Sequence, residues 1–380
     1  MAHLQHPDVQ VPWSQWQEEQ TLHVVIPYSN CFRWRTRREL VNDCIHHLRG
    51  MANVDLHVVE LAYGDRPFEV TGGHPSDVQL RTSSELWHKE QLINIGVAHF
   101  PANWKYGAYV DGDFHFTRHD LAIEAIHQMQ HYDFVQLFSS YADLTGETYG
   151  TGHRPLRVNN GFAYNYIQNG YRLPDGYESG GWKQAATGTG YDAGGYTLTY
   201  HDLMNGSVAQ ASTRTSSGGP GVGATGVGAT GGAWAFRRSA FDTVGGMLDV
   251  CALGHGDWFM TFGLVGETAP DMHVNGYTAD YLGAIGAWQR NAAKLHKNVG
   301  YVDCFATHHF HGAKSRRGYS SRDIILVKNQ YSPTTDLQKD WQGVYTLSGN
   351  KPALRDDIRR YFISRTEDDP GLYGDAPHTK

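Results

Sequence analysis

Two aspartates that directly follow a predicted buried strand are the sharpest candidates for chemistry. Asp111 and Asp113 flank a glycine in the segment YGAYVDGDFHF. In an α/β protein the carboxyl ends of the strands border the crevice that binds ligands, so this strand would deliver both carboxylates there. Hard oxygen donors suit Mg²⁺ or Mn²⁺. We therefore predict a divalent metal at this position, holding a diphosphate. A turn with two solvated aspartates would give the same triplet.

A second group combines histidines with cations. The segment THHFHGAKSRRGY contains His308, His309, His311, Lys314, Arg316 and Arg317. His309 and His311 are two residues apart, so they would share one face of an extended segment. Imidazoles beside carboxylates favour Mn²⁺ over Ca²⁺, and the cations that follow could neutralise a phosphate leaving group. In a chain with 22 histidines, a surface loop is the alternative interpretation.

Two further segments, GGAWAFRRSAF and ALGHGDWFM, contain candidates of other kinds. Gly232 permits close backbone approach to a ligand, and Trp234 offers a flat face for a sugar ring. Asp257 stands between a glycine and an aromatic residue, where it could act as a general base. Each has a structural alternative, because Trp234 could belong to the core and Asp257 could be a helix N-cap.

Four arginines crowd the opening turn of the first predicted helix: Arg33, Arg35, Arg37 and Arg38. The helix macrodipole is positive at that end and disfavours cations, so an anion should compensate them. A donor diphosphate and a nucleic-acid backbone are two candidates. The third interpretation is a solvated basic face that includes Glu39 and Asp43.

Hydrophobic periodicity indicates the elements that position these residues. Strands are predicted at 22–30, 55–65, 105–116 and 133–141, and helices at 33–48, 84–100, 121–129 and 353–365, with Ser83 or Ser84 as the N-cap of the second helix. Residues 233–249 are predicted to be a strand leading to a short helix. The alternation predicts an α/β fold. We expect an N-terminal arm at 1–20, one domain at 21–330 and a C-terminal extension at 331–380. Residues 142–230, rich in Gly and Tyr, are predicted to be a long loop region.

Composition narrows the function classes. The 380 residues are 40% hydrophobic and 19% charged, which excludes a disordered or fibrous protein. A net charge of −7 lacks the positive field of a general nucleic-acid coat. No apolar run reaches the roughly 18 residues of a membrane helix, and four scattered cysteines fit a reducing compartment, so we expect a cytoplasmic protein without a membrane partner. P-loop, dinucleotide-binding, hydrolase-elbow and zincin motifs are absent from the sequence.

In their order along residues 22–320, these segments resemble a metal-dependent glycosyltransferase of the GT-A fold. The β-1,4-galactosyltransferases and the polypeptide N-acetylgalactosaminyltransferases are most similar in motif order. The matching segments are VVIPYSN with FRWRTRREL, SELWHKEQLINIGV, DGD, GGAWAFRRSAFDTVGG and the histidine that follows. Where those families have Gly-Gly-Glu-Asp or Gly-Gly-Glu-Asn, this chain has GHGD, so the glutamate is missing.

The resemblance implies a Rossmann-like mixed sheet and transfer of a sugar from a nucleotide-sugar, expected to be a UDP-sugar, with Mn²⁺ or Mg²⁺. The implied metal ligands are Asp111, Asp113, His309 and His311, with Asp257 as the base of an inverting reaction. The donor would contact Arg33, Arg35, Asp111, Lys314 and Arg316, while Gly232 and Trp234 would shape the acceptor pocket. The acceptor is a hydroxyl of a glycan, a protein or a modified DNA base. A nucleotidyltransferase acting on a sugar phosphate and a non-catalytic carbohydrate-binding protein are the alternatives.

Overall fold

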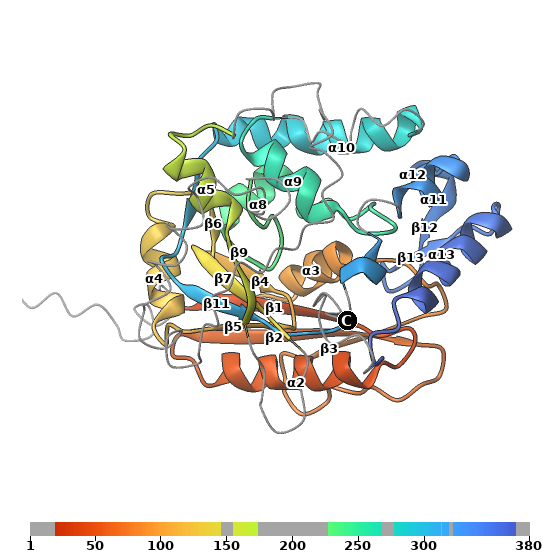
Figure 1. The fold of residues 1–380 in the computed structure, drawn as a ribbon, viewed down its shortest axis with the longest axis horizontal. Helices are drawn as coiled ribbons and strands as arrows, with labels where there is room; N and C mark the ends of the chain where they lie inside the picture. Colours follow the sequence, from red (N-terminus) through yellow and green to blue (C-terminus); the bar gives the residue numbers. More distant parts are fainter. Residues whose placement is uncertain are drawn as a thin grey trace, which may run out of the picture.

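A mixed sheet of seven strands forms the centre of the molecule (Figure 1). The computed structural model describes residues 20–145, 155–173, 227–267, 277–312, 314–318 and 322–369, with only the backbone of 156, 314 and 315. The strand order is β10-β6-β9-β4-β1-β2-β3. The strands are β1 (Leu22–Ser29), β2 (Val54–Tyr63), β3 (Val78–Thr82), β4 (Tyr106–Val110), β6 (Phe134–Gln136), β9 (Ala233–Arg237) and β10 (Val299–Tyr301).

The sheet is mixed because β9 runs antiparallel to both its neighbours, β4 and β6, whereas the other pairs are parallel. Helices α2 (Arg35–Arg49) and α4 (Leu121–Gln128) cover one face. The other face carries α3 (Lys89–Ala98), α5 (Phe162–Gln168), α8 (Arg238–Val244), α9 (Gly256–Leu264) and α10 (Ala279–Ala292). The predicted α/β class is confirmed.

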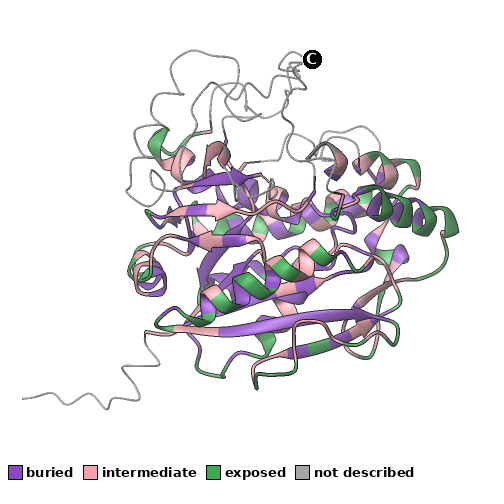
Figure 2. Ribbon diagram, turned by 60° about the horizontal axis from the view of Figure 1, so that its bottom comes forward, coloured by how far each residue is buried: buried purple, intermediate pink, exposed green. Residues whose placement is uncertain are grey.

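Strand β1 shows why both faces need helices. Val25 belongs to the core under α3, while Val24 and Ile26 belong to the core under α2. A parallel strand buried on both faces has a nearly continuous apolar run rather than an alternating one, as LHVVIPYS does. Figure 2 shows the buried strands behind helices whose outer faces are exposed.

A second sheet of four strands stands beside the first in the order β5-β11-β7-β8. Its strands are β5 (Phe114–Phe116), β11 (Phe305–His308), β7 (Ser140–Leu144) and β8 (Pro155–Asn160). Strand β8, helix α5 and the end of β7 fall inside the stretch 142–230 that the sequence predicts to be a loop, and that prediction is wrong for them. The sequence of β8, PLRVNN, has too few apolar residues to show the alternation of a strand. Residues 146–154 and 174–226 lie outside the described part.

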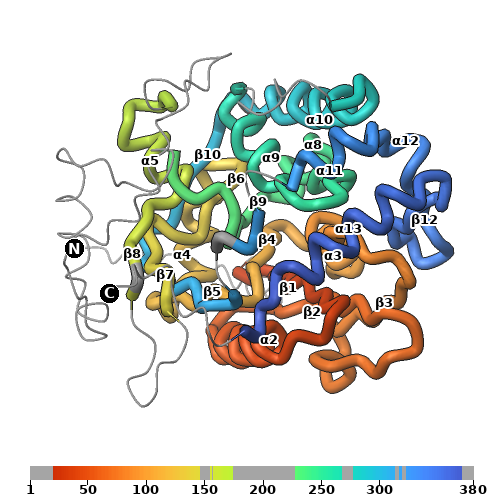
Figure 3. The backbone as a smooth tube through the Cα atoms, turned by 45° about the vertical axis from the view of Figure 1, so that its right-hand side comes forward, coloured from red at the N-terminus to blue at the C-terminus, as the bar shows by residue number. Residues whose placement is uncertain are grey.

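The C-terminal extension packs on the central domain. After α11 (Asp323–Lys328), it contains α12 (Pro333–Asp336), β12 (Leu337–Lys339), β13 (Tyr345–Leu347) and α13 (Pro352–Ser364). Its apolar side chains share the core of α3 and α9, among them Tyr331, Val344, Leu354, Ile358 and Phe362. In Figure 3, α13 lies beside α3, and the chain after it returns towards the start of α2.

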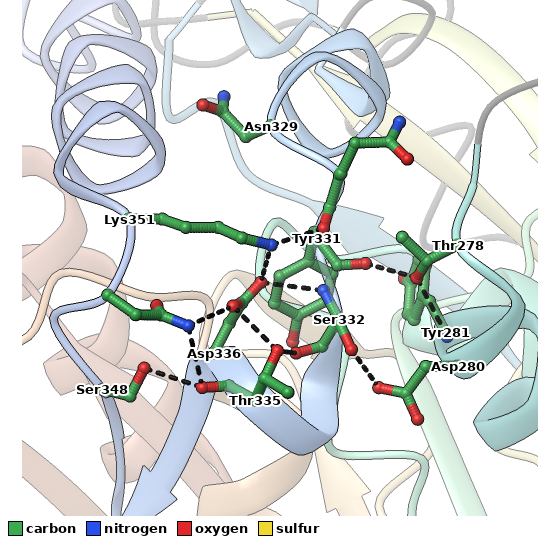
Figure 4. A network of polar contacts seen from close by, with 12 residues as sticks. Thr278, Asp280, Tyr281, Asn329, Tyr331, Ser332, Thr335, Asp336, Ser348 and Lys351 are labelled. Carbon is green, nitrogen blue, oxygen red and sulfur yellow. Dashed lines mark hydrogen bonds and ion pairs between the residues drawn. The ribbon is translucent and has the colours of Figure 1, made fainter.

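Polar contacts around Asp336 fix the start of this extension (Figure 4). Asp336 is fully buried and accepts hydrogen bonds from the backbone N of Ser332 and from Lys351 Nζ, both at 2.8 Å. Ser332 also donates to Asp280, in the first turn of α10, at 2.5 Å. The buried carboxylate therefore joins Ser332 to Lys351 within the extension, and the bond from Ser332 to Asp280 links the extension to α10.

Among the described residues, no helix combines the length and the apolar character that crossing a membrane requires.

Candidate functional site

Asp111, Gly232 and Asp257, three of the predicted site residues, lie at the carboxyl edge of the central sheet. Asp111 directly follows β4, and its backbone N donates to the carbonyl O of Gly232, at the start of β9, at 2.7 Å. Gly232 has φ +93°, and a Cβ there would lie 2.7 Å from the ring of Phe114. The structure therefore gives Gly232 a role in holding Asp111, because only glycine tolerates both that backbone conformation and that contact.

Lys89 joins the two predicted acidic groups of this edge. Its Nζ donates to Asp111 at 2.8 Å and lies 3.9 Å from Asp257 Oδ2. Asp257 lies in the first turn of α9, and the N-cap position belongs to His255, so the N-cap interpretation of Asp257 is wrong. Burial raises the pKa of Asp111, and the charge of Lys89 opposes that effect. Sequence reasoning missed Lys89, although it begins α3 within the quoted segment SELWHKEQLINIGV.

Gly231 lets the Asp257 carboxylate lie directly against the backbone. A Cβ at this position would lie 2.2 Å from Asp257 Oδ2 and 3.9 Å from Asp111 Oδ2. No real side chain fits at the shorter distance, so glycine is required for steric reasons.

Asp113 meets two imidazoles in the adjacent turn. Its Oδ2 lies 2.8 Å from His311 Nε2 and 3.5 Å from His308 Nε2. The ligand atoms of the three residues lie within 4.8 Å of one another, close enough to share one metal ion. Asp113 Oδ1 is buried and has no hydrogen-bond partner in the described part of the chain. A carboxylate oxygen in that state fits an additional cationic ligand, because a buried acceptor is otherwise costly to leave unpaired.

A second carboxylate stands behind each imidazole. His308 Nδ1 lies 2.6 Å from Asp143 Oδ1, and His311 Nδ1 lies 3.8 Å from Glu367 Oε2. Such partners orient a ligating imidazole and select its tautomer. Burial would lower the pKa of His308, but Asp113 and Asp143 raise it to about 9. Burial would raise the pKa of Asp113, but the charges of His308 and His311 hold it well below its usual range.

Strand register decides which histidine joins this group, and the predicted ligand His309 does not. His308 pairs with Phe114 of β5 on one side and with Asp143 of β7 on the other. The ring of His309 instead lies 4.4 Å from that of His115. The expectation for His309 is corrected in favour of His308, because the strand ends at His308 and the following turn brings His311 back to Asp113.

Trp234 is a core residue, so its predicted place in an acceptor pocket is wrong. It is 3% exposed, and its indole N–H donates to the carbonyl of Thr230 at 2.8 Å. It shares one face of β9 with Phe236, which is fully buried in the same core. A tryptophan packed on both sides has no free face for a sugar.

The arginines predicted to bind a diphosphate are neutralised by carboxylates of the chain itself. Arg33 lies 3.5 Å from Glu69 and Arg35 lies 3.6 Å from Glu39, with both arginine side chains more than half exposed. The first backbone N–H groups of α2 have no acceptor within the helix and donate to the Asp368 carboxylate instead, from Arg35 at 2.7 Å and from Thr36 at 2.8 Å. The anion that the macrodipole argument requires is therefore supplied by the C-terminal extension.

Arg37, which was not predicted to be a site residue, is the arginine of this helix that turns inward. It forms a pair with Glu367 at 2.6 Å, and Arg365 reaches the same buried carboxylate at 2.8 Å. Arg316 lies 3.5 Å from Asp369. Lys314 begins a short 3-10 helix, and its side chain lies outside the described residues.

Glu90 is a buried carboxyl group next to this cluster. It is 3% exposed, and a Cβ at Gly256 would lie 2.6 Å from its carboxyl group. Its pKa is raised to about 8, chiefly by burial. Within that net value, the charge of Lys89 lowers the pKa and the charge of Asp257 raises it. At neutral pH the group therefore carries its proton.

Comparisons with known proteins add little to this geometry. No protein-family profile matches the sequence, and no curated protein is significantly similar to it. One solved structure with some similarity is that of a protein from Desulfovibrio desulfuricans G20, provisionally identified as a nucleotide-diphospho-sugar transferase. The match has a TM-score of 0.22 and 16% identity, and it covers 33% of this chain and 58% of that one.

Proposed function

We propose that this protein is a glycosyltransferase that uses a nucleotide-sugar donor and a divalent metal. The observation that supports this best is the group of Asp113, His308 and His311, whose imidazoles are each backed by a carboxylate. It lies at the carboxyl edge of a mixed α/β sheet, beside the Lys89, Asp111 and Asp257 cluster. A cation site next to a lysine and a free carboxylate provides the two functions that sugar transfer requires, neutralisation of a leaving diphosphate and deprotonation of an acceptor.

Asp113, His308 and His311 would hold the metal, whereas the Asp111 carboxylate pairs with Lys89 and is not one of the three. Their mixed oxygen and nitrogen donors suit Mn²⁺ better than Ca²⁺. When bound, the ion supplies positive charge for the diphosphate. Lys89 would hold Asp111 in place and supply a second cation, since its side chain is only 12% exposed and lies between two carboxylates.

Asp257 would act as the base. In the proposed reaction, the acceptor hydroxyl oxygen forms a bond to the anomeric carbon of the donor and loses its proton to the Asp257 carboxylate. The bond between that carbon and the diphosphate oxygen breaks, and the diphosphate leaves with the electron pair. Attack from the side opposite the leaving group inverts the anomeric centre. Gly231 would allow the Asp257 carboxylate to keep this position, because any side chain there would collide with it.

The donor class is tested by calorimetric titration of UDP, GDP, CMP and dTDP, with and without Mn²⁺. The titrations compare the parent with Asp113→Ala and with Asp242→Ala, a control whose side chain is 64% exposed. We expect one nucleotide, UDP, to bind only with Mn²⁺, and Asp113→Ala alone to abolish that binding. If no nucleotide binds under any condition, the proposal is wrong.

The catalytic assignment is tested separately with Asp257→Asn. This variant should keep metal-dependent nucleotide binding and lose at least 100-fold in turnover, the usual size of a general-base contribution. Unchanged turnover would remove Asp257 from the mechanism. Nucleotide binding by a parent protein that transfers no sugar to glycan, protein or DNA acceptors would favour a binding module, and release of pyrophosphate from a nucleoside triphosphate would favour a nucleotidyltransferase.

A further inference from the structure

A second group of possible metal ligands lies at the opposite edge of the sheet. His23 of β1 lies directly opposite Asp55 of β2 in the register of the two parallel strands. His57 is two residues further along β2, so its side chain leaves the same face of the sheet as that of Asp55. Strand geometry therefore places two imidazoles and one carboxylate together on one face.

The three side chains converge on one oxygen. Asp55 Oδ2 lies 3.0 Å from His23 Nδ1 and 3.1 Å from His57 Nε2. A tetrahedral ion with bonds of about 2.1 Å holds its ligand atoms about 3.4 Å apart, so an expansion of a few tenths of an ångström would admit it. As in the group around Asp113, the ligand atoms of the three residues all lie within 4.8 Å of one another.

Packing holds the two imidazoles in place and leaves the carboxylate accessible. His23 and His57 are 7% and 3% exposed, and their rings lie 5.2 Å and 4.7 Å from the ring of Phe100. The Asp55 side chain is 33% exposed, so solvent reaches the group from that side. An ion would have a path of entry and a coordination position for water, while rotation of the imidazoles is restricted.

This group is separate from the proposed catalytic site. His23 lies opposite Gly107 in β4, and Asp111 follows four residues later. At about 3.3 Å per residue the two groups are about 13 Å apart along the strands. One ion cannot serve both.

We propose that His23, Asp55 and His57 form a binding site for Zn²⁺ or a similar transition-metal ion. Two imidazoles with one carboxylate are a donor set that Zn²⁺ prefers and that Mg²⁺ and Ca²⁺ do not. The bound ion links the beginning of β1 to β2. Binding to the folded state alone stabilises the protein, by roughly 3 °C in Tm when free Zn²⁺ is 100 times its Kd. The site does not depend on the proposed transferase activity.

The test counts ions with Co²⁺, whose visible absorption reports tetrahedral coordination. The full-length protein is freed of metal with EDTA and titrated as the parent, His57→Gln, His308→Gln and the double variant. His127→Gln is the control, since His127 is exposed on α4. We expect the parent to bind two ions, each single site variant to bind one, and the control to bind two. Zn²⁺ should displace the His57-dependent ion, and it should raise Tm in His308→Gln but not in the double variant.

Circular dichroism and cooperative unfolding must first show that His57→Gln is folded. If it is not, Asp55→Asn replaces it, because Asp55 is partly exposed and the amide keeps its shape. An ion count that neither variant reduces overturns the proposal. The same count distinguishes failure of the proposed function from failure of this proposal. If the His57-dependent ion binds and the His308-dependent ion does not, the proposed catalytic metal is wrong and the site at His23, Asp55 and His57 is retained.

Discussion

The buried carboxyl group of Glu90 makes stability depend on pH in the direction opposite to that of most carboxylates. Its pKa is raised from an ordinary value of 4.5 to about 8, chiefly by burial. The folded protein therefore keeps a proton that the unfolded chain loses above pH 4.5. Since the folded state binds more protons between those two values, its stability falls as pH rises from about 4.5 to about 8.

The size of the effect follows from the same two values. A difference between 4.5 and about 8 corresponds to about 5 kcal/mol once pH exceeds both. Between pH 5 and pH 8 the parent should lose roughly 3 kcal/mol through this group. Glu90→Gln keeps the shape of the protonated acid and cannot ionise, so the variant should not show this loss.

The assay is urea unfolding at pH 5 and pH 8 in EDTA, for the parent, Glu90→Gln and the control Glu39→Gln, whose side chain is 57% exposed. The free energy of unfolding of Glu90→Gln, relative to the parent, should rise by roughly 3 kcal/mol from pH 5 to pH 8. The control should follow the parent. If Glu90→Gln and the parent change in parallel between the two pH values, Glu90 ionises normally and the reasoning is refuted.

Two other substitutions test the site and the C-terminal extension. Gly231→Ala should reduce turnover at least tenfold without loss of folding, because its Cβ would lie 2.2 Å from Asp257 Oδ2. Gly283→Ala is the control, since the added methyl group would have open space around it. If Gly231→Ala and the control turn over substrate at equal rates, the steric argument is wrong. Arg37→Met should lower the free energy of unfolding by about 3 kcal/mol in urea, since it removes one partner of the buried Glu367 carboxylate. A loss below about 1 kcal/mol would show that Arg365 suffices.

The sequence predicts the sheet well because its elements carry their own signals. The helix over 33–48 and the strand before Asp111 appear in the structure as α2 and β4, since both have an apolar pattern of the right period. The predicted start of the next helix is wrong. Helix α3 begins at Lys89, and Ser84, an expected N-cap, instead accepts a hydrogen bond from the backbone N of Leu347. A residue paired across the chain gives no local signal for that role.

The site is predicted less well, because its composition depends on register and on distant pairs. Either His308 or His309 could face Asp113 until the pairing of β11 with β5 and β7 is known. The burial of Trp234 could have been predicted from the sequence, because Trp234 and Phe236 alternate with small residues in AWAFR. That alternation is typical of a strand with one large apolar face.

The crowd of arginines at the start of α2 shows how a sound physical argument can identify the wrong anion. The macrodipole requires compensation there, and the chain supplies it from more than 300 residues away through Glu367 and Asp368. The same extension reaches His311 through Glu367, so one carboxylate both neutralises Arg37 and stands behind a proposed metal ligand. The C-terminal extension, for which sequence patterns indicated no role, is therefore part of the architecture of the site, and its acidic residues occupy the positive end of α2 that a diphosphate would otherwise use.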